Sequence, residues 1–134
     1  MGVAKPAERP VSKERMARAG LRAFFRIAEL WGLSVDEQLK LLGSPARSTY
    51  FKWKRDGASS LPRDVLERIS YVLGIYKALQ VLLPDERAAD AWVRKPNTAP
   101  VFGGRSALDR MLSGNVADLY EVRRYLDAER GGWR

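Results

Sequence analysis

"SVDEQLKLLGSPARSTYFKWKR" (Ser34–Arg55) decides how the first half of this chain is organised. Ser34 and Glu37 have the S-x-x-E spacing, in which each side chain satisfies a free backbone N–H of the other residue. This pairing predicts a helix of about two turns that starts after Ser34 and ends at Gly43, where a glycine suits the end of a helix.

A second helix is predicted directly after this turn. Ser44 is a suitable N-cap, and Pro45 suits the first helical position, where its missing N–H costs nothing. Ala46, Tyr50 and Trp53 fall on one face of that helix because they are spaced by four and three residues. The opposite face offers hydroxyl groups and cations: Ser48, Phe51, Lys52 and Arg55, with Arg47 and Thr49 at its edges.

Two short capped helices joined by a tight Gly-Ser turn match a helix-turn-helix motif. The second helix of that motif enters the DNA major groove, and its first residues reach base edges. Long cations near the helix start can read guanine, hydroxyl groups can contact bases or phosphates, and the later cations suit phosphates. The residues expected to bind DNA are Arg47, Ser48, Thr49, Lys52, Lys54 and Arg55. An ordinary solvated basic helix face is the alternative interpretation.

The distribution of charge favours the DNA interpretation. The net charge is +8, and residues 1–60 hold 12 basic and 6 acidic side chains, hence +6. Residues 61–134 hold 12 basic and 10 acidic side chains, hence +2. The more basic half therefore coincides with the predicted motif and would attract a polyanion.

The remaining periodicities predict further helices, and no segment alternates like a strand. Ser12 can cap a helix that runs to about Trp31. A long helix over residues 63–83 is apolar on two sides, so it either joins both halves in the core or forms a homodimer contact. After Pro84 we expect short helices, and a last helix from Val116 to Glu129. The sequence thus predicts an all-α fold.

Several classes of function are disfavoured by composition. The chain has no cysteine and no histidine, which removes thiolate metal sites and the usual catalytic base and nucleophile pairs. We therefore expect no enzyme activity, no metal and no cofactor. The sequence also has no signal peptide and no membrane span, and a cytoplasmic location is expected.

Six blocks of sequence together resemble the Xre/MbcA/ParS family of bacterial antitoxins. Four belong to its C-terminal toxin-binding domain: W-x-x-x-P-N (Trp92–Asn97), P-x-F-G-G (Pro100–Gly104), LDRMLSG (Leu108–Gly114) and YLDAERGGW (Tyr125–Trp133). Two are similar to its helix-turn-helix domain: LLGSPARSTYFKW (Leu41–Trp53) and RISYVLGIYKAL (Arg68–Leu79).

The resemblance covers residues 15–134 and implies two domains and two partners. The domains are a helix-turn-helix domain with its long connecting helix (15–83) and a toxin-binding domain (84–134). A basic arm (1–14) lies outside the resemblance, and we expect it to be mobile because it contains two prolines and no apolar periodicity. The first partner is a RES-type toxin that consumes NAD, or a related ADP-ribosyltransferase-like toxin, whose active site the antitoxin covers. The second is palindromic operator DNA, through which the antitoxin represses its own operon. A homodimer is expected on such a palindrome.

The C-terminal end supplies the expected toxin contacts. Gly131 and Gly132 are expected to release the chain from the last helix, so that Trp133 enters the toxin cleft as a large buried anchor. Folding of Trp133 back onto its own domain is the alternative. The residues expected to contact the toxin are Arg123, Arg130, Gly131, Gly132, Trp133 and Arg134.

Two other functions remain open. The chain is alternatively a helix-turn-helix transcriptional regulator whose C-terminal domain dimerises or binds a ligand, with no toxin partner. It is otherwise an inhibitor that acts through protein contacts alone and has lost DNA binding.

Overall fold

The computed structural model describes residues 12–132, and within this range the chain forms α-helices and no strand. The helices are α1 (Lys13–Leu30), α2 (Val35–Leu41), α3 (Arg47–Asp56), α4 (Arg63–Leu82), α5 (Glu86–Trp92), α6 (Ala107–Met111) and α7 (Val116–Gly132). The predicted all-α fold is confirmed. No helix in the described range is both long enough and apolar enough to cross a membrane.

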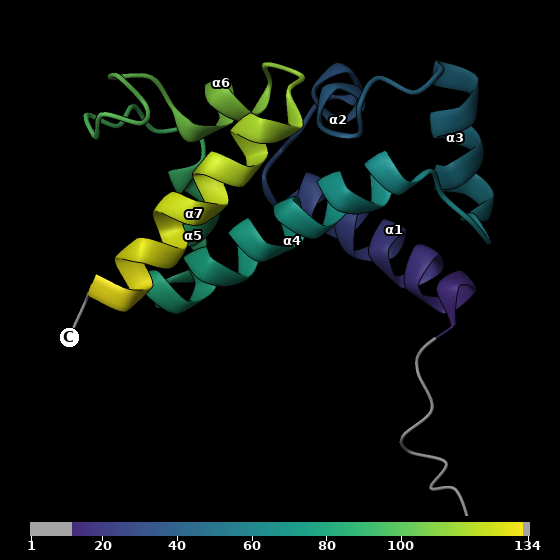
Figure 1. Cartoon of the computed structure of the whole chain (residues 1–134), viewed down its shortest axis with the longest axis horizontal. Coiled ribbons are helices and arrows are strands. Elements are labelled where there is room, and N and C mark those ends of the chain that lie inside the picture. The colour runs from purple at the N-terminus through teal and green to yellow at the C-terminus, as the bar shows by residue number, and fades with distance from the viewer. Residues whose placement is uncertain (1–11, 133–134) are drawn as a thin grey trace, which may run out of the picture.

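Helix α4 runs through the middle of the molecule, and α1, α5 and α7 pack around it (Figure 1). Its buried residues include Val65, Ile69, Val72 and Leu79, which recur at helical spacing along one side of α4. A single hydrophobic cluster extends from α1 to α7, so both halves of the chain share one core. The long helix therefore joins the two halves, as one of the two sequence interpretations expected.

Helix α1 starts within the range that we expected for the N-terminal arm. The Ser12 hydroxyl accepts a hydrogen bond from the Arg15 backbone N–H at 3.2 Å, so Ser12 is the N-cap. Lys13 and Glu14 consequently belong to α1 rather than to an arm over residues 1–14. Residues 1–11 lie outside the described residues.

The turn between α2 and α3 corrects the predicted cap of the second helix. The capping box of Ser34 and Glu37 is present, but α3 begins two residues later than expected, with Ala46 as its N-cap and no side-chain cap. Ser44 has a φ of +61° and donates its backbone N–H to Leu39 O at 2.8 Å. Ser44 thus completes the end of α2, and this backbone shape prevents it from capping α3.

The C-terminal half is held together by an aromatic cluster of Trp92, Phe102 and Tyr125. The ring of Phe102 meets the ring of Tyr125 edge-on at 5.0 Å, and the Trp92 ring stacks over Tyr125 at 6.5 Å. These contacts fix the loop after α5 against α7. Trp92 and Phe102 therefore have a structural role in this half.

The end of α7 corrects a second prediction. The helix continues from Val116 through Gly132 instead of ending at Glu129. Gly131 and Gly132 are therefore helical and do not release the chain at the position we expected. Trp133 and Arg134 lie outside the described residues.

Candidate functional site

The outer face of α3 carries the predicted DNA-binding side chains. Tyr50 and Trp53 are buried beneath α3 because they occupy its inner face. The predicted contacts Arg47, Ser48, Lys52, Lys54 and Arg55 are exposed, whereas Thr49 is half-buried. The sequence thus placed five of the six side chains on the solvent side of the helix.

Arg47 is held at the start of α3 by two contacts. Its Nη1 donates to Asp36 Oδ1 of α2 at 2.9 Å, and its guanidinium lies 5.9 Å from the Phe51 ring centre. Both ends of the ion pair are exposed, so its net contribution to stability is small, about 0–1 kcal/mol. The guanidinium is therefore positioned near the helix N-terminus but can exchange Asp36 for another anion.

Lys54 lies on the side of α3 that faces α1. Its Nζ lies 6.0 Å from the ring centre of Phe25, and Arg18 and Arg22 line the same shallow groove as Lys54. The basic surface of α3 therefore continues onto α1. We did not predict Arg18 and Arg22 as part of this surface, although the excess of cations in residues 1–60 was a general signal.

A second exposed surface lies on α7. Arg123, Asp127 and Arg130 share one face of the helix because they are spaced by four and three residues. Arg123 Nε lies 3.4 Å from Asp127 Oδ2. The Arg123 guanidinium also lies directly over Gly74 of α4, where a Cβ atom would approach it to 2.2 Å. Arg123 therefore spans the junction between α4 and α7.

Tyr120 extends this surface and was missing from our predicted contacts. It is 47% exposed and meets the ring of Tyr71 edge-on at 6.0 Å. Tyrosine and arginine are enriched in protein interfaces. The sequence signal was the position of Tyr120 off the apolar stripe formed by Leu119, Val122 and Leu126, which the structure buries.

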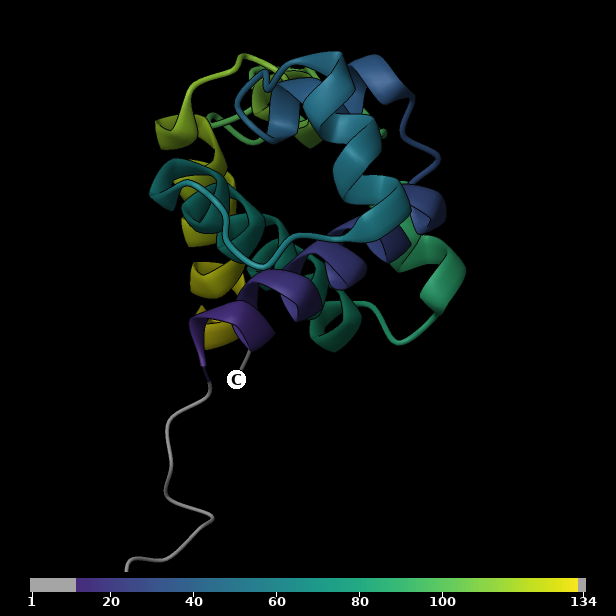
Figure 2. The same cartoon turned by 90° about the vertical axis from the view of Figure 1, so that its right-hand side faces the viewer.

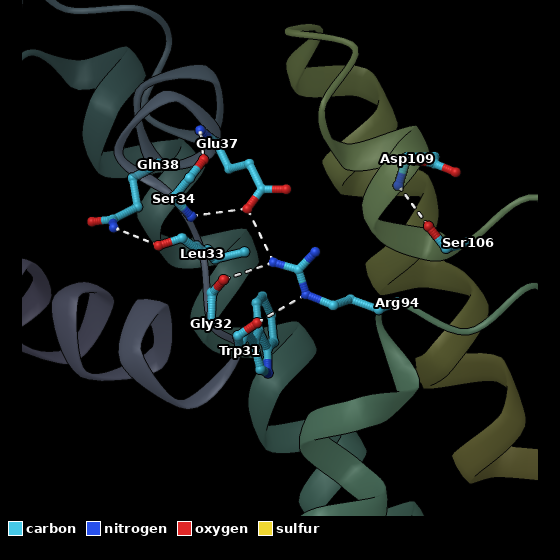
Figure 3. A network of polar contacts seen from close by, with 9 residues as sticks. All are labelled: Trp31, Gly32, Leu33, Ser34, Glu37, Gln38, Arg94, Ser106 and Asp109. Carbon is cyan, nitrogen blue, oxygen red and sulfur yellow. Dashed lines mark hydrogen bonds and ion pairs between the residues drawn. The ribbon is translucent and has the colours of Figure 1, made fainter.

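Arg94 connects the two halves of the molecule (Figure 3). It lies just after α5, and its side chain reaches the turn between α1 and α2. There it donates to Trp31 O at 3.1 Å, to Gly32 O at 2.8 Å and to Glu37 Oε1 at 3.0 Å. One side chain of the C-terminal half thus satisfies the end of α1 and contacts the capping residue of α2.

Glu37 receives hydrogen bonds from both halves. Its Oε1 accepts from the Ser34 backbone N–H at 2.9 Å as well as from Arg94 (Figure 3). Partial burial raises the pKa of Glu37, but the hydrogen bonds from Ser34 and Arg94 outweigh this effect and hold the pKa below its ordinary value. The charged carboxylate is therefore the form that joins Arg94 to α2.

The polar network continues from α2 to α3 through buried groups. Gln38 donates to Leu33 O at 3.1 Å and accepts from the Tyr50 hydroxyl at 2.6 Å. Burial raises the pKa of Tyr50, although nearby Arg47 acts in the opposite direction, so the phenol stays protonated and donates. Neighbouring contacts thus link Arg94, α2 and the helix that carries the predicted DNA contacts.

The geometry defines a class of protein: a helix-turn-helix unit fused through a shared helix to a second helical unit with its own exposed surface. Comparison with known families agrees. Residues 10–74 match the antitoxin Xre-like helix-turn-helix domain, and residues 78–132 match the antitoxin Xre/MbcA/ParS C-terminal toxin-binding domain. The chain belongs to the Xre/MbcA/ParS family of antitoxins.

A similar protein comes from Sinorhizobium fredii (strain NBRC 101917 / NGR234) and is named "Uncharacterized protein y4oB". It is 56% identical over 123 residues, which cover 92% of this chain and 93% of the relative. The similarity therefore includes both halves and the helix between them.

Proposed function

We propose that this antitoxin neutralises a RES-type, NAD-consuming toxin by covering its active site, and that it represses its own operon by binding operator DNA. The observation that carries the proposal is the match of residues 78–132 to a toxin-binding domain, on the same folded body as a basic helix-turn-helix. Binding to operator DNA would place the protein in the cytoplasm. The two partners would bind at opposite ends, because α3 and the end of α7 lie far apart (Figure 1).

The proposed toxin surface is the exposed face of α7. Arg123 and Arg130 supply cations that suit acidic or phosphate-binding groups, and Tyr120 supplies apolar area beside them. Gly131 and Gly132 belong to the proposed contact as the last turn of α7. Trp133 and Arg134 follow this turn and remain proposed contacts that lie outside the described residues.

The proposed DNA surface is the outer face of α3 with the neighbouring cations of α1. Arg47 exchanges Asp36 for a base edge or a phosphate, which is feasible because their ion pair is exposed. Ser48, Thr49, Lys52, Lys54 and Arg55 complete the contact. A palindromic operator would then bind two copies of the chain, one for each half-site.

The toxin proposal is tested by co-expression with the product of the adjacent gene, with cell growth and cellular NAD as readouts. Full-length protein is compared with a chain that stops after Asp127. The last buried residue of α7 in the described range is Leu126, so the shortened chain keeps its apolar core. We expect full-length protein to restore growth and NAD, and the shortened chain to remain folded but fail to protect.

Equal protection by the shortened chain would remove the end of α7 from the toxin contact. If the full-length chain neither binds the adjacent product nor changes NAD, the toxin proposal is wrong. The chain would then be better described as a helix-turn-helix regulator without a toxin partner.

The DNA proposal is tested with the promoter fragment of its own operon at several salt concentrations. Arg47→Ala and Lys52→Ala should each weaken binding by about 1–3 kcal/mol, as expected for cations that read base edges. The matched control is Arg124→Ala, which removes an exposed, ion-paired arginine from α7. Normal repression by the Arg47→Ala, Lys52→Ala double variant would contradict the assignment of α3.

A further inference from the structure

Phe51 is a large apolar residue on the basic outer face of α3. It is 43% exposed, whereas Tyr50 and Trp53 on the inner face of the same helix are buried. Arg47 and Arg55 lie one helical turn before and one turn after Phe51, on the same side of α3. The phenylalanine ring therefore stands among the cations that we propose to bind DNA.

Within residues 12–132, no other helix covers the outer face of α3. Figure 1 places α3 at one edge of the molecule, and Figure 2 looks onto that edge, where no other helix passes in front of α3. The other large apolar side chains that the described structure leaves exposed, Met16, Val81 and Tyr120, lie on α1, α4 and α7. Among these exposed side chains, Phe51 is the one on the helix that would enter the major groove.

Two neighbouring side chains hold the Phe51 ring in place. The buried Tyr50 ring meets it edge-on, with 5.0 Å between the ring centres, and the Tyr50 hydroxyl is itself fixed by its hydrogen bond to Gln38. The Arg47 guanidinium carbon lies 5.9 Å from the centre of the Phe51 ring. The ring is therefore positioned before DNA arrives, and little side-chain freedom is lost when it binds.

The chemistry of the ring identifies the feature of DNA that it suits. A phenyl ring has no hydrogen-bonding atom, so it cannot read the donors and acceptors of a base edge. The apolar feature of the major groove is the 5-methyl group of thymine, and phenylalanine is among the side chains that contact this group. Residues near the start of the second helix of a helix-turn-helix reach base edges, and Phe51 lies one turn after Arg47, the first residue of α3.

We propose that Phe51 determines operator specificity by contacting the 5-methyl group of a thymine in the major groove. The inference rests on the proposed binding of operator DNA, and it adds a residue that was not among the six expected DNA contacts. Arg47 and Phe51 act side by side. The guanidinium binds a polar base edge or a phosphate, and the ring contacts the methyl group of a nearby base pair.

The first test replaces single thymines by deoxyuridine in the part of its own promoter that the full-length protein protects from nuclease digestion. Deoxyuridine keeps the hydrogen-bonding groups of thymine and lacks its methyl group. For at least one thymine, wild-type protein should bind the substituted fragment about three- to fivefold more weakly at constant salt, the effect of one buried methyl-sized group. Phe51→Ala should bind the thymine and deoxyuridine fragments equally well at that position.

Val81→Ala is the matched control, because Val81 is an apolar residue of α4 that is 61% exposed. This variant should keep the wild-type preference for thymine, and circular dichroism should show wild-type helical content in both variants.

Equal binding of wild type to every deoxyuridine fragment would overturn the proposal, and so would a preference for thymine that persists in Phe51→Ala. In either case, binding of wild type to the promoter in preference to unrelated DNA would leave the proposed operator binding intact. Failure of wild type to bind the promoter would overturn both.

The second test separates contact with the methyl group from support of Arg47. Arg47→Ala should bind the promoter about 5- to 150-fold more weakly than wild type, because a cation that reads a base edge is lost. It should still prefer the thymine fragment about three- to fivefold over the deoxyuridine fragment, because Phe51 is retained. A preference for thymine that disappears in Arg47→Ala would assign the methyl contact to Arg47 and overturn the proposal.

Discussion

At the scale of single residues, Arg94 has the widest consequences. Its guanidinium replaces water at two backbone carbonyls and one carboxylate of the other half of the molecule. Nothing in the sequence around Arg94 indicated this contact, because its partners lie about 60 positions earlier in the chain. The W-x-x-x-P-N block, which contains Arg94, indicated the toxin-binding domain but not the hydrogen bonds that Arg94 makes with the other half.

We predict that Arg94→Ala lowers the free energy of unfolding by about 1–2 kcal/mol, since the Trp31 and Gly32 carbonyls and Glu37 lose a charged donor. Urea unfolding followed by circular dichroism measures this loss. Lys95→Ala is the control, because Lys95 is the adjacent exposed cation. Equal effects of both substitutions would mean that Arg94 acts only through its charge.

Asp118 gives a second prediction at this scale. The Ser113 hydroxyl donates to its Oδ2 at 2.6 Å and Arg110 Nε donates to its Oδ1 at 2.9 Å. These bonds, that of Ser113 foremost, hold the pKa of Asp118 below its ordinary value. Its stabilising effect is therefore present above the unfolded pKa, about 4, and is lost as pH falls through the folded value.

Asp118→Asn should consequently destabilise the protein at neutral pH and cost less in acid. Chemical unfolding of wild type and variant between neutral pH and about pH 3 measures the difference. The two stability curves should converge as pH falls. Parallel curves would contradict a stabilising role for the charged carboxylate.

At the scale of elements, α7 separates what the sequence could predict from what it could not. Its buried stripe follows from spacing alone, since Leu119, Val122 and Leu126 recur every three or four residues and are buried. Its end did not follow, because glycines permit either a helix or an exit from one. Ser44 shows the same limit. Serine favours the N-cap of a helix, but the backbone of Ser44 has a positive φ that completes the end of α2 instead.

Gly131→Ala tests the helical end of α7. Nothing lies within 4 Å of the Cβ that the substitution adds, and alanine favours a helix by up to about 1 kcal/mol over glycine. We expect slightly higher helical content in circular dichroism and unchanged or improved neutralisation of the toxin. Loss of neutralisation in a folded variant would mean that the chain must leave the helix at Gly131 to bind.

At the scale of the whole molecule, the fold was predictable as a set of helices but not as one body. The sequence identified α4 as apolar on two sides but did not indicate which helices pack against it. The structure packs α1, α5 and α7 against it, so both halves share one continuous core. The candidate DNA face was predictable because the spacing of Tyr50 and Trp53 identifies the inner face of α3.

We therefore expect both halves to unfold in a single transition. Tryptophan supplies local reporters: Trp53 lies in the helix-turn-helix half, and Trp92 lies in the C-terminal half. In each variant that retains one of these two, with the other tryptophans replaced by phenylalanine, tryptophan fluorescence and circular dichroism should give denaturation curves with the same midpoint. A fluorescence midpoint that differs from the circular dichroism midpoint of the same variant would mean that the halves are independent units.

The two family matches meet inside α4, with residues 10–74 on one side and 78–132 on the other. A helix transmits rotation as well as distance, since each residue adds about 100° and 1.5 Å. One residue inserted between Gly74 and Ala78 would turn the later part of α4 by roughly a quarter of a revolution relative to its earlier part, and the helices that pack along α4 would lose their common register. A recombinant that joins the first half of one relative to the second half of another must therefore keep the number of residues in α4 as well as the sequences of its two parts. That number sets the rotation between the two parts of the helix.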